Sequence, residues 1–206
     1  VNFSFWSDAG TPQWRITYPA GATQSGGWYS LVAGFRRAIE KGMPVLDAEF
    51  MSKLAFEQCR KIFVGDGGAD IPMLGERQKN LNEAGAILLE KFGGKFINLI
   101  KANDYDAPKI VKAIYNNFLT FRDEAEFGGK KIMFLKRAQI CANDISYILE
   151  KYKKAPIKNI NALTAFADYR LPQILRNFGA ISYSEELAKL VDNYVVINAQ
   201  SREELE

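Results

Sequence analysis

The stretch IMFLKRAQICANDISYILEKY, residues 132–152, decides the fold class of this chain. Its apolar residues recur every three to four positions, which is the period of an α-helix with one buried face. The stripe comprises Leu135, Ala138, Cys141, Ile145 and Leu149. We therefore predict one long helix from about Ile132 to Tyr152, with Lys136 beside the stripe rather than on it.

Stretches with the same period lie on both sides of this helix, separated by Gly and Pro stop signals. Side chains that cap helix N-termini precede several of them. Further helices are predicted at about 28–39, 47–63, 70–92, 96–100, 106–114, 161–166 and 172–178, with caps at Asp47, Asp70, Asp106 and Asn161. The sequence therefore predicts a mainly α fold with at most a small β element.

The length of the chain and the lack of a linker within it favour one domain. The chain has 206 residues, 48% of them hydrophobic, which is enough for a substantial core. We find no repeat and no linker rich in Pro, Ser or Gly, so we predict a single domain over residues 1–206. The chain starts at Val1 without Met, and residues 201–204 read SREE, a pattern that opens a helix. We interpret it as a fragment that lacks N- and C-terminal parts.

Charge and hydropathy argue against large polymeric or membrane partners. The formal net charge is only +3, too small to indicate a stable nucleic-acid partner or a membrane-binding surface. No stretch approaches the ~20 continuous apolar residues that span a bilayer. Cys59 and Cys141 each lie in an apolar helical pattern, which is typical of reduced core thiols. We expect a cytoplasmic protein.

The absence of histidine narrows the chemistry further. It excludes Ser-His-Asp and Cys-His nucleophile systems and nearly every zinc site built on imidazole. We therefore predict no metal site, and any catalyst in this chain would use carboxylates, Lys or Tyr.

Two ionisable residues occupy unusual positions, and each has a structural alternative. Lys136 lies on an otherwise apolar helix, so it either extends to solvent or meets an anion. Asp168 lies close to the start of the Pro172 helix, where backbone N–H groups and the helix dipole keep a carboxylate ionised. Capping that helix explains Asp168 equally well.

Other groupings are open to both functional and structural interpretations. Phe5-Trp6-Ser7-Asp8 combines aromatic faces with a carboxylate, which suits stacking a heterobase, although core aromatics explain it too. Phe121-Arg122-Asp123-Glu124-Ala125 fits a surface ion-pair cluster. The Gly-rich loop 65–70 and the Gly-Gly-Lys strings at Lys95 and Lys130 lack the spacing of a phosphate-binding loop, and we interpret them as turns.

Six blocks occur in an order that is more specific than any one of them. They are Phe5-Trp6-Ser7-Asp8, Gly27-Trp28-Tyr29-Ser30-Leu31, residues 71–77 (IPMLGER), Phe121-Arg122-Asp123-Glu124-Ala125, residues 136–140 (KRAQI) and residues 166–176 (FADYRLPQILR). In this succession the sequence resembles the queuosine-salvage family of N-glycosylases, over essentially the whole chain.

The resemblance implies a mainly helical fold akin to DNA glycosylases and a cofactor-free hydrolysis. The substrate would be queuosine 5′-monophosphate, whose N-glycosidic bond is cut to release queuine for tRNA queuosine salvage. Lys136 and Asp168 match the catalytic positions of the family. Asp168 would support the cationic ribosyl character of the transition state, form a transient glycosyl ester or orient water. Lys136 would supply positive charge to the phosphate or position the ribose.

The resemblance also suggests where the substrate binds. Queuine is a deazaguanine that carries a cyclopentenediol on a secondary amine, so its pocket needs aromatic faces and a carboxylate. The substrate-binding candidates are Phe5, Trp6, Ser7, Asp8 and Tyr169, with Arg122 and Arg170 as phosphate ligands. Two alternatives remain open, namely a glycosylase acting on a base flipped out of nucleic acid and a non-catalytic module that binds a modified nucleotide.

Overall fold

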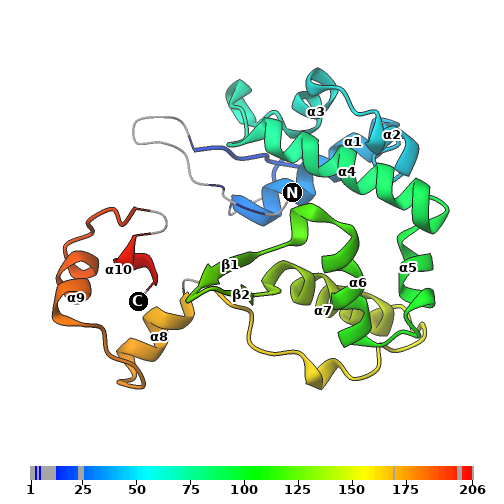
Figure 1. The fold of residues 1–206 in the computed structure, drawn as a ribbon. Helices are drawn as coiled ribbons and strands as arrows, with labels where there is room; N and C mark the ends of the chain where they lie inside the picture. Colours follow the sequence, from blue (N-terminus) through cyan, green and yellow to red (C-terminus); the bar gives the residue numbers. More distant parts are fainter. Residues whose placement is uncertain are drawn as a thin grey trace. The chain divides into compact units, whose positions relative to one another are not determined.

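The computed structural model describes residues 3, 5, 13–22, 26–168, 170–198 and 201–205 (Figure 1). Over these residues it contains ten α-helices and one hairpin of two antiparallel strands. The prediction of a mainly α fold with a small β element is therefore confirmed, whereas the likeness to DNA glycosylases stays a prediction. The chain divides into two compact units, Val1–Asp104 and Tyr105–Glu206. Whether both act as one domain also stays a prediction.

The first unit consists of helices that pack around a core of aromatic and aliphatic side chains. Its helices are α1 (Gly27–Glu40), α2 (Ala48–Ser52), α3 (Phe56–Phe63), α4 (Leu74–Phe92) and α5 (Phe96–Ala102). The core includes Trp14, Ile16, Leu31 and Phe63, all at most 3% exposed. Helix α2 packs against α4 so closely that a Cβ atom added at Gly85 would lie 2.4 Å from the backbone nitrogen of Ser52.

The prediction of one helix from Asp47 to Phe63 was wrong, because the structure forms two helices there. Asp47 caps α2 as expected, since its Oδ1 accepts the Phe50 N–H at 2.8 Å. The chain then breaks before α3 because the side-chain amide of Asn82, on α4, donates to the carbonyl oxygens of Met51 and Leu54 at 2.8 and 3.2 Å. These long-range bonds replace the bonds that would continue the helix.

Two predicted caps were also wrong. Asp70 does not cap α4 but forms an ion pair with Arg60, with 2.7 Å between Oδ1 and Nε, and α4 begins four residues later at Leu74. Asn161 does not cap a helix but lies inside a short 3-10 turn, Ile160–Ala162. A local sequence pattern cannot reveal that a carboxylate such as Asp70 is engaged by a side chain from another helix.

The second unit contains the hairpin and the long helix. Its elements are α6 (Ala107–Asn117), β1 (Glu124–Phe127), β2 (Lys130–Met133), α7 (Lys136–Lys151), α8 (Arg170–Asn177), α9 (Glu185–Asp192) and α10 (Arg202–Leu205). Helices α6 and α7 pack against each other. Asp106 caps α6 as predicted, because its Oδ1 accepts the Lys109 N–H at 3.1 Å. Ser201 likewise accepts the Glu204 N–H at 3.2 Å at the start of α10.

Helix α7 starts later than predicted. Residues 130–133 pair with β1 through Glu124 opposite Met133, so Ile132 belongs to a strand. Leu135 then adopts a left-handed backbone with φ of 54°, and the helix begins at Lys136. Of the predicted apolar stripe, Ala138 is buried and Leu135, Cys141, Ile145 and Leu149 are partly buried, so none of its members is exposed.

The sequence also predicted that no helix spans a membrane and that both cysteines are free thiols. Among the helices that the structure describes, none has the length and apolar character needed to cross a membrane. Both cysteines are free thiols: Cys59 is buried and Cys141 is partly exposed. Burial raises the pKa of Cys59 to about 11.

Candidate active site

Lys136 and Asp168 form an ion pair in the second unit. Lys136 is the first residue of α7, and Asp168 ends the segment that leads into α8. The Lys136 ammonium contacts Oδ2 of Asp168, and the side chains are 32% and 25% exposed. The lysine therefore meets an anion rather than extending freely to solvent, which decides between the two alternatives that the sequence left open.

The Asp168 carboxylate is held in its charged form. Its Oδ2 bonds to Lys136, and its Oδ1 accepts the backbone N–H of Arg170, the first residue of α8, at 2.9 Å. Two contacts hold the pKa of Asp168 below its ordinary value. The larger effect comes from the Lys136 ammonium and the smaller one from the Arg170 N–H. Asp168 therefore combines both roles suggested by the sequence, because it bonds the first turn of α8 and also presents an ionised carboxylate.

Gln139 fastens the Asp168 segment to α7. It lies one turn after Lys136 and is only 4% exposed. Its Oε1 accepts the Thr164 N–H at 2.9 Å, and its Nε2 donates to the Thr164 hydroxyl at 3.2 Å. Sequence reasoning missed this residue, although an amide between the buried Ala138 and Ala142 was a usable signal.

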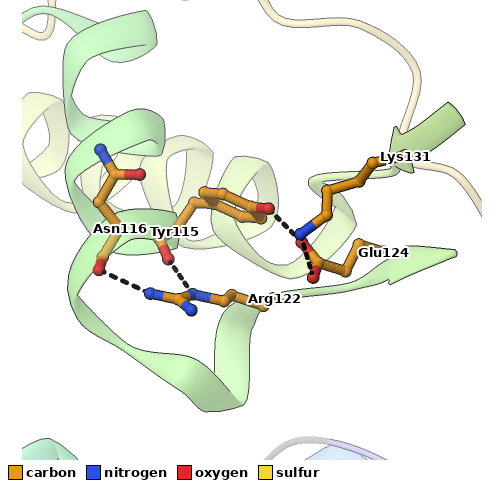
Figure 2. A network of polar contacts seen from close by, with 5 residues as sticks. All are labelled: Tyr115, Asn116, Arg122, Glu124 and Lys131. Carbon is orange, nitrogen blue, oxygen red and sulfur yellow. Dashed lines mark hydrogen bonds and ion pairs between the residues drawn. The ribbon is translucent and has the colours of Figure 1, made fainter. Parts of the chain in front are cut away.

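Arg122 comes five residues after the end of α6, and its guanidinium reaches back to that end in a polar network that also includes the hairpin (Figure 2). Its Nε and Nη2 donate to the carbonyl oxygens of Tyr115 and Asn116 at 3.2 and 3.1 Å. A cation here complements the negative end of the helix dipole. Glu124 completes the network by bonding the Tyr115 hydroxyl and, at 2.8 Å, the Lys131 ammonium. The phosphate-binding role of Arg122 stays a prediction, since these contacts already engage its guanidinium.

Phe5 belongs to the first unit, where Arg77 holds it. Its ring stacks on Trp14 with 5.8 Å between centroids. The guanidinium of Arg77 lies 5.0 Å from the Phe5 ring and 4.4 Å from the Phe3 ring, and Arg77 donates to the Phe3 carbonyl oxygen at 2.7 Å. Arg77 is fully buried, which lowers its pKa to about 10. Its place on the apolar stripe with Leu74 was the signal that sequence reasoning did not use.

The other candidates are only partly placed. Trp6, Ser7, Asp8 and Tyr169 lie outside the described residues. Arg170 is exposed and contributes its backbone N–H to Asp168. In the described part of the chain, no three Cys, Asp or Glu side chains gather in a way that would hold a metal ion.

The geometry of the second unit suits chemistry on a cationic centre. The ion pair joins a carboxylate that stays ionised at neutral pH to an ammonium, and both remain partly open to solvent. Such a carboxylate stabilises a positive charge that develops beside it, and such an ammonium attracts an anionic substrate group. The fold and the site together define a mainly helical protein with a carboxylate–ammonium pair at a helix junction.

Comparison with known proteins shows to which family this chain belongs. The model of the queuosine salvage protein family matches residues 1–206. The chain is 41% identical over 204 residues to the queuosine 5′-phosphate N-glycosylase/hydrolase of Mus musculus, covering 98% of this chain and 60% of that protein. The proteins of the same name from Bos taurus and Sphaerobacter thermophilus are 39% and 38% identical over 206 residues, which is 100% of this chain and 60% and 62% of theirs. The chain therefore belongs to the queuosine salvage protein family. It spans about 60% of the length of these relatives.

Proposed function

We propose that this chain carries the catalytic ion pair of a hydrolase that cleaves the N-glycosidic bond of queuosine 5′-monophosphate and releases queuine for tRNA queuosine salvage. The observation that carries the proposal is the pairing of Lys136 with Asp168 in a chain whose relatives are named for this reaction. The reaction adds water across the bond, with the hydroxyl going to ribose C1′ and the proton to the base.

Asp168 is the residue to which we assign the central role. As the bond breaks, the ribose gains cationic character, and an ionised carboxylate in a partly desolvated site stabilises it. The same oxygen can attack C1′ to form a glycosyl ester or hold the attacking water. The low pKa of Asp168 supports these roles, because each of them needs the charged form.

Lys136 has a different assignment. Its ammonium contacts Asp168, and we assign its positive charge to the phosphate or ribose of the nucleotide. We assign substrate contacts to Phe5, Trp6, Ser7, Asp8 and Tyr169, and second-rank phosphate contacts to Arg122 and Arg170. We further propose that the protein works in the cytoplasm, without a cofactor and without a stable nucleic-acid or membrane partner.

The direct test follows free queuine by mass spectrometry. The unmutated chain, Asp168→Asn and Lys136→Met are each incubated with queuosine 5′-monophosphate and with unphosphorylated queuosine. We expect Asp168→Asn to lower base release by at least about 100-fold, as for the loss of one transition-state charge contact. Lys136→Met should reduce the preference for the monophosphate.

The matched control is Asp192→Asn. Asp192 pairs with Arg176 at 2.7 and 2.9 Å, so this change also removes a carboxylate charge from an ion pair of the same unit. It should leave base release unchanged. Nucleotide binding without turnover in the unmutated chain would favour a binding module, and salt-dependent oligonucleotide binding would favour a flipped-base substrate.

A further inference from the structure

Asp123 presents a buried carboxylate oxygen that has no partner among the described residues. It lies directly before β1, and its Oδ2 accepts the N–H of Arg137 at 3.1 Å. Its Oδ1 is buried and makes no hydrogen bond to any described group. Native proteins keep few such atoms because desolvating a carboxylate is costly, so the position requires an explanation.

The start of α7 explains why the carboxylate lies here, because its other oxygen, Oδ2, bonds an amide of that turn. The first amides of a helix have no acceptor within the helix and usually bond to a capping side chain. At α7 the capping position is Leu135, whose side chain cannot accept a hydrogen bond and whose φ is 54°. The first turn carries Lys136 and Arg137 and no acidic residue, although the dipole disfavours cations there. Asp123 supplies the acceptor and the negative charge that α7 itself lacks.

The hairpin holds Asp123 in place for this task. The Asp123 carbonyl oxygen accepts the Phe134 N–H at 2.9 Å, which extends the pairing of Glu124 with Met133 by one step. Asp123 thus continues the strand pairing at the open end of the hairpin, opposite the Gly128-Gly129 turn, rather than lying on a loose loop. Its bonding partner, Arg137, is the residue next to Lys136.

We propose that Asp123 is a positioning residue, which fixes the first turn of α7 and thereby holds Lys136 against Asp168. The effect on turnover rests on the proposed function, whereas the effect on the ion pair does not. Catalytic groups displaced by about 1 Å can lose on the order of 100-fold in rate. A helix that is anchored at its first turn keeps its first side chain from moving by that amount.

The first measurement needs no variant. Amide exchange followed by NMR should show the Arg137 N–H exchanging at least about tenfold more slowly than in an unstructured chain, because Asp123 satisfies an amide that the helix leaves unpaired. Exchange at the unstructured rate would show that the contact is absent and would overturn the proposal.

The second measurement is an NMR titration of the Asp168 carboxyl. In Asp123→Ala the anchor is lost, so the pKa of Asp168 should rise toward its ordinary value as Lys136 moves away. In Asp123→Asn a side-chain oxygen still accepts the amide, so the pKa should stay low. The control Asp106→Ala, which removes the carboxylate cap of α6, should leave this pKa unchanged.

The sign of the change separates positioning from plain electrostatics. If Asp123 acted on Asp168 only as a neighbouring negative charge, both Asp123 variants would lower the pKa of Asp168, since removing an anion favours another carboxylate. That result would overturn the proposal. If Asp123→Ala does not fold, the exchange of Arg137 and the titration in Asp123→Asn decide the question.

Turnover provides the functional readout. Asp123→Ala should reduce kcat for queuine release at least tenfold, with KM little changed, and Asp123→Asn should keep more than a third of the parent kcat. Full activity in a folded Asp123→Ala chain would contradict the proposal. If the unmutated chain releases no queuine, the proposed function fails, while exchange and titration still test the positioning role.

Discussion

Replacing Gly85 with Ala tests the close contact between α2 and α4 in the first unit. A Cβ atom at this position would lie 2.4 Å from the backbone nitrogen of Ser52 and 2.5 Å from the carbonyl oxygen of Ala48, where ordinary contact begins at 3.4 Å. Both atoms belong to the backbone of α2, so no side-chain rotation relieves the clash, and α2 must move by roughly 1 Å. Overpacking of this kind costs about 1–3 kcal/mol.

The matched control is Gly75→Ala on the same helix. Nothing lies within 4 Å of a Cβ atom at Gly75, so this variant gains helix propensity, up to about 1 kcal/mol, without a clash. Gly75 is the second residue of α4 and Gly85 lies in its interior, so Gly85→Ala gains at least as much helix propensity and also meets the clash. The difference in the free energy of unfolding between the two variants is therefore a lower bound on the cost of overpacking, and we expect roughly 2–3 kcal/mol, because both contacts are to backbone.

Tryptophan fluorescence during urea denaturation is the appropriate assay. All three tryptophans, at positions 6, 14 and 28, belong to the first unit, so the signal follows the unfolding of that unit alone. Equal midpoints for Gly85→Ala and Gly75→Ala would refute the close packing of α2 on α4.

Three further outcomes follow from the contacts described above. Gln139→Ala should speed exchange of the Thr164 amide about fivefold, matching the loss of a hydrogen bond worth ~1 kcal/mol, and unchanged exchange would contradict the bond. The pKa of Asp168 is depressed in the folded state, so its contribution to stability is present above the unfolded value of about 3.9 and is lost as pH falls through the lower folded value. Acid denaturation should show a shallower dependence there for Lys136→Met, and identical curves would argue against the ion pair. Cys59, fully buried with a pKa of about 11, should resist iodoacetamide at pH 8 in the folded chain and react after unfolding, as followed by mass spectrometry.

The parts of the fold that could be predicted from sequence are those set by local signals. Asp106 before an apolar helix and Gly93 in a left-handed conformation after one fix the start of α6 and the end of α4. The break between α2 and α3 could not be found in this way, because Asn82 imposes it from 28 residues away. Likewise, Ile132 fits a helical stripe locally, and only its pairing with β1 makes it a strand residue.

The candidate site divides along the same line. The catalytic roles of Lys136 and Asp168 are predicted only through the family resemblance, because each residue also has a structural explanation, and the structure places their side chains in contact. Gln139 and Asp123 were not selected, because their importance lies in the partners Thr164 and Arg137, which the chain brings to them only on folding. An amide or a carboxylate that acts through a distant backbone group leaves no recognisable spacing in the sequence.

The contact between Arg77 and Phe3 has a consequence for how the chain is made. The ribosome synthesises Phe3 74 residues before Arg77, the cation that later holds its carbonyl oxygen. At ~5–20 residues per second this delay is roughly 4–15 seconds. During that interval Phe3 and Phe5 lack the Arg77 guanidinium on which they pack in the folded unit, so this face of the nascent segment remains available to chaperones or to unwanted partners. Phe3 therefore gains this contact only after most of the first unit has been synthesised, whereas Phe5 can stack on Trp14 much earlier.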